Sequence, residues 1–305
     1  MKVISGRLDK IRFQKTCVAI GIFDGVHRGH QYLLKAMLSK ATHAKSVVIT
    51  FFPHPVHVLR PDLQLGYLVS LQHRLKLLEA LGVDACIVIN FTKKFARIEP
   101  QAFIRDTLVK RLGAKAIFVG EDFHFGRNRA GDVKLFEQLA PKYGYEMHGM
   151  PALMAGGTPI SSTRIRKLVT TGKLSATEKL LGRPFSMLGQ VIKGSGRGKE
   201  LGFPTANVAY ESSILPPNGV YAVRVFWKNK ILKGAANLGL RPSFREINPH
   251  VHLEVYILDF KQDFYGQSLE VQFIKKIRSE KKFASSQALI RQIKTDVRRI
   301  RQILK

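Results

Sequence analysis

The sequence predicts an α/β protein of two domains, in which a doubly wound parallel sheet is followed by an antiparallel barrel or sandwich with a terminal helix. First, 305 residues are long for a single core. Second, strand-like apolar runs alternate with helical patterns up to about residue 149, which is typical of a parallel sheet covered by helices on both faces. Third, short β-rich runs separated by Gly, Pro and Asn follow residue 184, and they favour antiparallel strands.

The first half contains four apolar runs, each short enough for a buried strand. They are Cys17–Phe23, Ser46–Phe51, Ala85–Asn90 and Ala116–Val119. The helical patterns between them are Leu71–Leu81, with Ser70 as N-cap and Gly82 past its end, and Gln101–Leu112 behind Pro100. In such a sheet the ligand site lies beyond the carboxyl ends of the strands.

The second half ends in a helix rather than a strand. Its predicted strands are Gln190–Lys193, Gly219–Trp227, Ile231–Asn237, Val251–Phe260 and Leu269–Ile277. From Ser285 to Leu304 apolar residues recur at helical spacing, so we expect this helix to dock its apolar stripe on the sheet and leave Lys and Arg in water.

Composition favours a folded cytoplasmic protein. Hydrophobic residues make up 45% of the chain, which is ample for packed interiors. The two cysteines, Cys17 and Cys86, lie far apart in apolar runs and form neither a metal motif nor a disulfide framework, so we predict core residues in a reducing compartment. No segment has the length and apolarity needed to cross a bilayer, so no membrane association is expected.

The net charge of +28 leaves nucleic acid open as a partner. Residues 271–305 alone hold eleven Lys and Arg against two acids. These bases are not interleaved with aromatic ladders or base-reading motifs, so we expect no specific nucleic-acid binding, while non-specific attraction to polyanions is possible. The alternative from another class is a basic RNA- or DNA-binding protein.

The segment Val18–His30, VAIGIFDGVHRGH, predicts a nucleotide site. An apolar strand ends at Asp24-Gly25 and a helix carrying His27 and His30 opens, which brings backbone N–H groups and a helix N-terminus to one point. The two histidines are three residues apart and share one helix face. Imidazoles there can donate to a triphosphate and stabilise the charge of departing pyrophosphate.

A second anion-binding pattern is PISSTRIR at residues 159–166. The hydroxyls of Ser162 and Thr163 and the guanidinium of Arg166 lie within one turn of a predicted helix, and they can hold the β- and γ-phosphates of ATP. The G-x-F-D-G-V-H-x-G-H and I-S-S-T-x-I-R patterns together resemble the FMN adenylyltransferase module of bacterial bifunctional riboflavin kinase/FAD synthetases. The resemblance implies further ATP contacts at Gly21, Phe23, Asp24 and Gly29.

The same family implies two flavin-binding loops. The segment Phe51–Pro55 resembles its F-x-P-H-P loop, which points to Pro53 and His54 as flavin contacts. The segment Gly120–Gly126 resembles its G-x-D-F-x-F-G loop, in which Asp122 faces the flavin ring and Phe123 adjoins it. An alternative is that His54 is an ordinary surface loop residue.

The C-terminal half carries a second phosphate loop. Gly194, Arg197 and Lys199 belong to a glycine-rich basic loop, and Thr205 and Asn207 offer oxygen ligands of the kind that Mg²⁺ prefers. The segment Gly202–Asn207 resembles the G-F-P-T-A-N signature of riboflavin kinases. By the same resemblance, Glu254 is the base that accepts the ribityl hydroxyl proton, and Arg278 lies near bound flavin.

The sequence therefore predicts a bifunctional enzyme of flavin cofactor biosynthesis. Residues 183–305 form an antiparallel β-barrel that phosphorylates riboflavin to FMN, and residues 1–182 form a Rossmann-like nucleotidyltransferase domain that converts FMN to FAD. The expected substrates are ATP, riboflavin and FMN, with Mg²⁺ as cofactor. An alternative enzyme transfers AMP or CMP to another acceptor and uses the second half as a binding module. The oligomeric state stays open.

Overall fold

The computed structural model describes residues 1–305 except 7–10, 64, 195, 212–213, 241–250 and 261. The chain divides into two compact units. The first comprises Met1–Gly66 and Leu71–Ser162, and the second comprises Tyr67–Ser70 and Thr163–Lys305. The predicted domain boundary at residue 182 stays a prediction.

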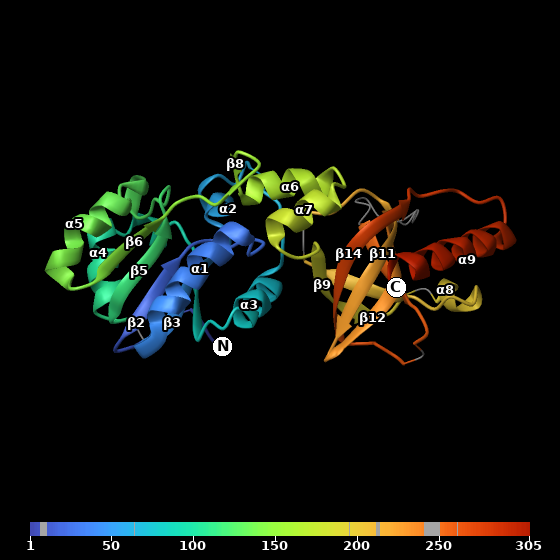
Figure 1. Cartoon of the computed structure of the whole chain (residues 1–305), viewed down its shortest axis with the longest axis horizontal. Helices are drawn as coiled ribbons and strands as arrows, with labels where there is room; N and C mark the ends of the chain where they lie inside the picture. Colours follow the sequence, from blue (N-terminus) through green and yellow to red (C-terminus); the bar gives the residue numbers. More distant parts are fainter. Residues whose placement is uncertain (7–10, 64, 195, 212–213, 241–250, 261) are drawn as a thin grey trace. The chain divides into compact units, whose positions relative to one another are not determined.

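The first unit is built on a six-stranded parallel sheet in the order β1-β4-β3-β2-β5-β6 (Figure 1). Its strands are β1 (Lys2–Ser5), β2 (Thr16–Ile20), β3 (Lys45–Phe52), β4 (Ala85–Asn90), β5 (Ala114–Gly120) and β6 (Glu146–Met150). The chain runs outward from β2 through β3 to β4 and then returns to the other side of β2 as β5. The strand order therefore reverses at β2, and ligands of such folds bind beyond the carboxyl ends of the strands at this switch point.

Helices cover both faces of this sheet. One core packs α1 and α3 against Cys17 and Ala19 of β2, and the other packs η4 and α5 against Val18 and Ile20. The longer helices are α1 (Arg28–Lys40), α3 (Leu71–Ala80) and α5 (Val133–Tyr143). The shorter elements are η2 (Ala41–His43), α2 (Pro55–Leu59), η3 (Phe95–Arg97), α4 (Pro100–Ala102), η4 (Phe103–Val109), η5 (Arg127–Arg129), β7 (Met154–Ala155) and β8 (Thr158–Pro159). The doubly wound arrangement predicted for this half is confirmed.

Three details of the first unit differ from the sequence prediction. The edge strands β1 and β6 were not predicted, because their residues are half exposed and lack a continuous apolar run. The helix predicted over Gln101–Leu112 is π-helical from Phe103 to Val109, where the amide of Lys110 donates to the carbonyl of Arg105 at 3.0 Å. A π-helical turn inserts one extra residue into the helical repeat, which apolar spacing alone does not reveal.

The second unit is a closed antiparallel barrel rather than a sandwich. Its strands follow the order β10-β13-β12-β11-β14-β9 around the barrel. They are β9 (Ser186–Ile192), β10 (Ala206–Tyr210), β11 (Gly219–Trp227), β12 (Lys230–Leu240), β13 (Val251–Ile257) and β14 (Ser268–Arg278). Strand β10, which carries Asn207, was not predicted because it is short and contains alanine and asparagine.

The barrel is accompanied by the helices α6 (Ser162–Thr170), α7 (Leu174–Leu181), α8 (Arg197–Glu200) and α9 (Ser286–Ile303). The terminal helix is confirmed, with Ser285 as its N-cap. Ile300 and Leu304 of its apolar stripe pack with Val220 and Ile277 on the outer face of the barrel (Figure 1).

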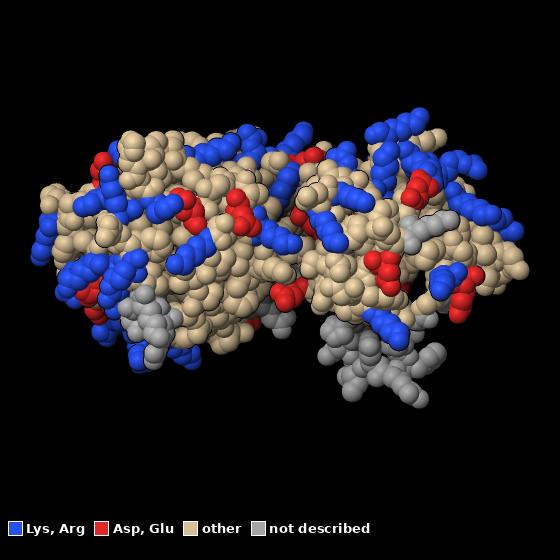
Figure 2. All heavy atoms as spheres, turned by 90° about the horizontal axis from the view of Figure 1, so that it is seen from below, with Lys and Arg blue, Asp and Glu red and all other residues tan. Residues whose placement is uncertain are grey.

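The high positive charge is not gathered on one element of the visible face. On the face shown in Figure 2, Lys and Arg side chains are scattered and do not gather in one patch. Cys17 and Cys86 are buried free thiols, as predicted. Among the described residues, no helix combines the length and apolarity required to span a bilayer.

Candidate active sites

The first candidate site is the segment that connects β2 to α1, at the switch point of the parallel sheet. The amide of Gly21 still donates to the carbonyl of Ile49 in β3 at 3.1 Å, so the loop leaves the sheet only after this residue. The loop then turns inward, because Phe23 and Asp24 are both 1% exposed. A carboxylate as deeply buried as that of Asp24 is unusual in a surface turn. The predicted ATP-binding residues therefore lie in a structured, partly buried loop.

The backbone of this loop is strained. Phe23 and Val26 adopt φ angles of 53° and 41°, in the left-handed region that residues with a Cβ rarely occupy. Gly25 lies between them with φ 79°, which only glycine adopts at little cost. Conformations of this kind persist only where the surrounding structure enforces them, and they are concentrated at functional sites.

The two histidines lie at the start of α1. Helix α1 begins at Arg28, so His27 is its N-cap and not a helical residue as predicted from the sequence. The Nδ1 atom of His27 accepts from the amide of His30 at 3.3 Å, and the two rings are stacked with centroids 3.5 Å apart. Because Nδ1 of His27 accepts, its proton resides on Nε2, which is the atom that can donate to a ligand. Gly29 permits this stack, since a Cβ there would lie 3.2 Å from the ring of His27.

The environment of His30 favours a neutral imidazole. Burial lowers its pKa well below 6.5, and the nearby side chains of His27 and Arg74 lower it further. The edge of the Phe23 ring also contacts it, with centroids 5.3 Å apart. Within the described part of the chain, no group is hydrogen-bonded to its buried Nδ1 atom. His30 can therefore donate to phosphate oxygens without carrying charge of its own in the free site.

The predicted second anion pattern begins at the junction of the two units. The hydroxyl of Ser162 donates to the carbonyl of Asp24 at 3.0 Å, so the structure joins this residue to the first loop. Thr163 and Arg166 follow within the first turns of α6 and are described with the second unit. Their predicted role as phosphate ligands is not tested by these contacts.

The first predicted flavin loop follows β3. His54 is the N-cap of α2, and its Nδ1 accepts from the amide of Val56 at 3.1 Å, so this histidine shapes the local backbone. Pro53 is half-buried, and Phe52 beside it is 39% exposed. His57 is bonded through Nε2 to the carbonyl of Leu65 at 2.6 Å, which orients its ring independently of His54.

The second predicted flavin loop follows β5, at the other side of the switch point. Asp122 is exposed, whereas Phe123 is half-buried and packs beside Phe125 with ring centroids 5.7 Å apart. Gly120 allows the turn, since a Cβ there would lie 3.0 Å from the carboxylate of Asp122. The carboxylate is thus close to the end of β5, while the Phe123 ring contributes to the core.

The second candidate site is the glycine-rich loop of the barrel unit. A Cβ at Gly194 would collide with the side-chain amide of Asn207, and a Cβ at Gly198 would lie 3.1 Å from the hydroxyl of Thr205. The loop backbone therefore lies directly against the two predicted Mg²⁺ ligands. Lys199 is exposed in the short helix α8, and the side chain of Arg197 lies outside the described part of the structure.

Cross-strand pairing places Glu254 beside these ligands. Asn207 of β10 is directly opposite Glu254 of β13, and Glu254 is directly opposite Asn237 of β12. The neighbouring row of Val208 and Leu253 is buried in the barrel, so the three polar residues share the outer face. Asn237 was not predicted as a site residue. An amide in the middle of a β-rich run is the signal that would have identified it.

Arg278 is held by the terminal helix. Its Nε donates to the carboxylate of Asp296 in α9 at 2.8 Å, and its guanidinium lies over the ring of Phe283 at 5.7 Å. The two charged side chains are 18% and 7% exposed, which makes this a largely buried ion pair. Arg278 is therefore rigidly placed near the end of β14.

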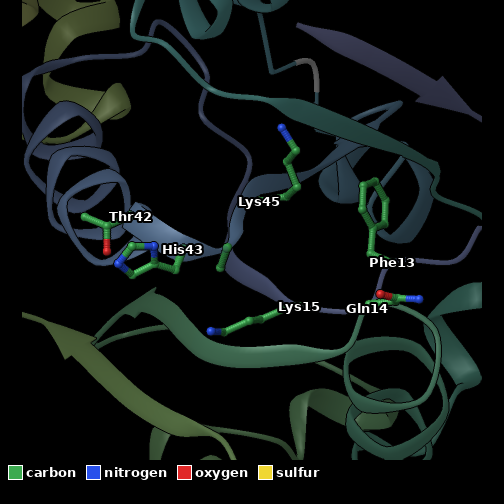
Figure 3. A pocket seen from close by; sticks show the side chains of 7 residues that line it. Phe13, Gln14, Lys15, Thr42, His43 and Lys45 are labelled. Atoms are coloured by element: carbon green, nitrogen blue, oxygen red, sulfur yellow. The ribbon is translucent and has the colours of Figure 1, made fainter.

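Neither candidate site coincides with the open pocket of about 470 Å³ in Figure 3. That pocket lies at the amino ends of β2 and β3 and is lined by residues that include Lys15, His43 and Lys45. Ligands of doubly wound sheets bind at the opposite, carboxyl ends. In the described ranges, no cluster of three or more His, Cys, Asp or Glu residues is arranged to hold a metal ion.

Comparison with known proteins also divides the chain into two parts. A family profile described as FAD synthetase matches residues 9–164, and one described as riboflavin kinase matches residues 181–304. The bifunctional riboflavin kinase/FMN adenylyltransferase of Escherichia coli K12 is 39% identical over 287 residues, which cover 93% of this chain and 91% of that protein. The chain belongs to this bifunctional family.

Other relatives agree with this assignment. The enzyme of the same description from Bacillus subtilis 168 is 36% identical over 288 residues, with 92% of this chain and 90% of that protein covered. A crystal structure described as a macrolide-efflux protein from Streptococcus pneumoniae superimposes with a TM-score of 0.85 at 31% identity and covers 99% of both chains. The predicted fold, family and pair of activities, riboflavin phosphorylation and FMN adenylylation, are confirmed.

Proposed function

We propose that the two activities of this bifunctional riboflavin kinase/FMN adenylyltransferase chain reside in the two sites described above. The observation that supports this most directly is that each family match contains one complete polar arrangement. The stacked pair His27 and His30 lies within residues 9–164, and the cross-strand pair Asn207 and Glu254 lies within residues 181–304. We place the boundary of the two catalytic domains at residue 182.

In the barrel, riboflavin is phosphorylated to FMN. The ribityl 5′-hydroxyl oxygen attacks the γ-phosphorus of ATP, the bond to the β-phosphate oxygen breaks, and ADP leaves. Glu254 accepts the hydroxyl proton, a general-base role. Asn237 lies directly opposite Glu254 and can orient its carboxylate. Arg278, fixed by Asp296, contacts the flavin, and the loop of Gly194, Arg197 and Lys199 binds the phosphates.

The residues at this loop fit a magnesium ion. A Cβ at Gly194 would meet the side chain of Asn207, and a Cβ at Gly198 would meet the carbonyl of Phe203 and the hydroxyl of Thr205. Asn207 and Thr205 thus offer neutral oxygen ligands beside a phosphate loop. A Mg²⁺ ion held by these oxygens would neutralise part of the charge on the ATP phosphates. The remaining binding comes from this chain's own residues, which orient the phosphates through backbone N–H groups.

In the first unit, FMN is adenylylated. A phosphate oxygen of FMN attacks the α-phosphorus of ATP and pyrophosphate leaves, so no proton has to be removed from the nucleophile. Catalysis consists of alignment and of hydrogen bonds to the leaving group from His27 and His30. Ser162, whose hydroxyl donates to the carbonyl of Asp24, binds the β- and γ-phosphates, and the sequence pattern that contains it assigns the same role to Thr163 and Arg166. Pro53, His54, Asp122 and Phe123 contact the flavin.

Two single variants and their mixture test this division. We expect His30→Ala to convert riboflavin to FMN without making FAD, and Glu254→Gln to make FAD from supplied FMN without phosphorylating riboflavin. A mixture of the two variants should restore the complete sequence, because FMN released by one is adenylylated by the other. Loss of both activities in either variant contradicts the proposed division.

The buried free thiols Cys17 and Cys86 favour a reducing compartment, and we propose that the protein acts in the cytoplasm on small-molecule substrates. Cells are treated with a membrane-impermeant thiol reagent, either intact or permeabilised, under conditions that unfold the protein. We expect the protein to be labelled only in the permeabilised cells.

A further inference from the structure

Arg74 is a fully buried arginine that neither family motif contains. It lies in α3 with 0% of its surface exposed, and it is the largest side chain buried to this degree. A guanidinium is rarely buried unless hydrogen bonds and neighbouring dipoles compensate the lost hydration. Its Nη1 atom donates to the hydroxyl of Thr50 at 3.1 Å and to the carbonyl of Phe51 at 3.3 Å. Both acceptors belong to β3, next to the strand that leads into the ATP loop.

The hydroxyl of Thr50 extends this contact into the ATP loop. Arginine has only donors, so the Thr50 oxygen must accept from Arg74 and its own proton is free to point elsewhere. That proton is donated to the carbonyl of Ile22 at 2.8 Å. Ile22 precedes the strained residue Phe23, whose ring contacts His30.

The second acceptor leads to the other substrate loop. Phe51 is the first residue of the segment Phe51–Pro55, which is the first predicted flavin loop. One guanidinium therefore bonds to the backbone of the flavin loop and, through Thr50, to the backbone of the ATP loop. Relative placement of two substrates within about 1 Å has large effects on reaction rates.

Arg74 also acts on His30 through its charge. Three influences lower the pKa of His30, namely burial, the ring of His27 and the guanidinium of Arg74. The uncharged ring of Phe23 also packs on this histidine. Arg74 is thus a permanent cation whose charge favours the neutral form of His30.

We propose that Arg74 is a positioning residue for FMN adenylylation, which aligns the ATP loop with the flavin loop through Thr50 and the carbonyl of Phe51. The inference rests on the proposed assignment of adenylylation to this site.

The test compares four variants of the full chain. Arg74→Met removes the charge and the donors, Arg74→Lys retains the charge, and Thr50→Val interrupts the bond to Ile22 while retaining Arg74. The matched control is Leu78→Ala, which removes a fully buried side chain one turn further along α3 that bonds to neither Thr50 nor Phe51. For each we measure kcat and KM for FAD formation, the rate of FMN formation by the barrel, thermal unfolding, and the pKa of His30 by NMR of histidine-labelled protein.

We expect Arg74→Met to lower kcat/KM for FAD formation by between about tenfold and a hundredfold and to raise the pKa of His30. Arg74→Lys should recover part of the rate and keep the pKa of His30 low. Thr50→Val should raise the KM for ATP without moving that pKa. Leu78→Ala should lower the unfolding temperature while leaving both kinetic constants and the pKa of His30 near their wild-type values. FMN formation should be unchanged throughout.

The inference is overturned if Arg74→Met retains FAD formation within about twofold of wild type. It is also overturned if Leu78→Ala reproduces both the kinetic loss and the pKa change, since the role of Arg74 would then be general stability. If Arg74→Met does not fold, Thr50→Val decides the inference, because unchanged kinetics in that variant contradict it. Wild-type protein that makes no FAD refutes the proposed function instead.

Discussion

The substitution His30→Ala removes the half of the histidine pair that lies inside α1. In the proposed reaction His30 donates to pyrophosphate, and a hydrogen bond to a charged group is worth about 1.5–3 kcal/mol. The stacked ring also orients His27, since the centroids are 3.5 Å apart. Loss of one preorganised donor to developing negative charge typically lowers kcat by about 10²–10³. We therefore expect kcat for FAD formation to fall about a hundredfold or more.

The same variant should remain folded. Among the described residues, none satisfies the buried Nδ1 atom of His30, and an unsatisfied buried polar atom costs about 1–3 kcal/mol. Its removal offsets much of the packing lost with the ring. The assay separates FAD from FMN by chromatography after incubation with ATP, and FMN formation by the barrel serves as an internal control. Tyr32→Ala, at an exposed position of the same helix, is the matched control. FAD formation within about threefold of wild type would refute the reasoning.

The pH dependence of stability gives a second readout of His30. Its pKa is below 6.5 in the folded protein, so the unfolded chain takes up a proton first as the pH falls. The contribution of neutral His30 to stability is complete above pH 6.5 and decreases as the pH falls from 6.5 towards the folded-state pKa. Wild type should therefore lose stability relative to His30→Ala between pH 7 and pH 5. A constant difference in the free energy of unfolding would contradict this assignment.

Three further predictions concern the barrel. Gly194→Ala should displace the Asn207 amide and lower kcat/KM for FMN formation by about tenfold or more, while adenylylation of supplied FMN stays unchanged. Equal loss of both activities would contradict this prediction. Asp296→Ala should destabilise the barrel by about 3 kcal/mol in chemical unfolding and raise the KM for riboflavin, since Arg278 loses its largely buried partner; unchanged values would argue against this pair. Replacing exposed basic residues of α9 by glutamine should weaken RNA binding at low salt and leave flavin synthesis unchanged. RNA binding that resists salt and depends on the RNA sequence would contradict non-specific attraction. The replaced residues are Arg291, Lys294 and Arg298.

The choice of these three bases depends on the structure. Two other arginines of α9 make contacts that their positions in the sequence do not indicate. Arg301 forms two hydrogen bonds with the carboxylate of Asp259 at 2.6 and 2.7 Å, and Arg299 donates to the carbonyl of Ile277 at 3.3 Å. Replacing them would change the packing of the helix as well as its charge.

The sequence predicted those parts of the fold that depend on local pattern. Continuous apolar runs identified the buried strands β2 to β5, and the helical spacing after Ser285 identified α9. The edge strand β1 is stabilised by pairing with β4, in which Lys2 lies opposite Ala85, and no local pattern contains a contact between residues so far apart in the chain. The buried Asp296 of α9 has the same origin, because its partner Arg278 belongs to a different element.

The site was predictable where one loop carries several functional groups, and less so where groups converge from different strands. The motif around His27 and His30 is contiguous, so its residues were identified. The pattern did not show at which residue the helix begins, so it did not reveal that His27 is the N-cap of α1. Asn237 and Arg74 were missed because each is isolated in sequence. Their significance comes from the registry of β12 with β13 and from the burial of α3 against β3.

The most direct test of the account is a time course of flavins formed by the purified full-length protein from riboflavin, ATP and Mg²⁺. We expect FMN to appear first and FAD to follow with a lag, because the product of the barrel site is the substrate of the site beside α1. Appearance of FAD with no preceding rise of FMN, or no conversion of riboflavin with either Mg²⁺ or Mn²⁺, would contradict it.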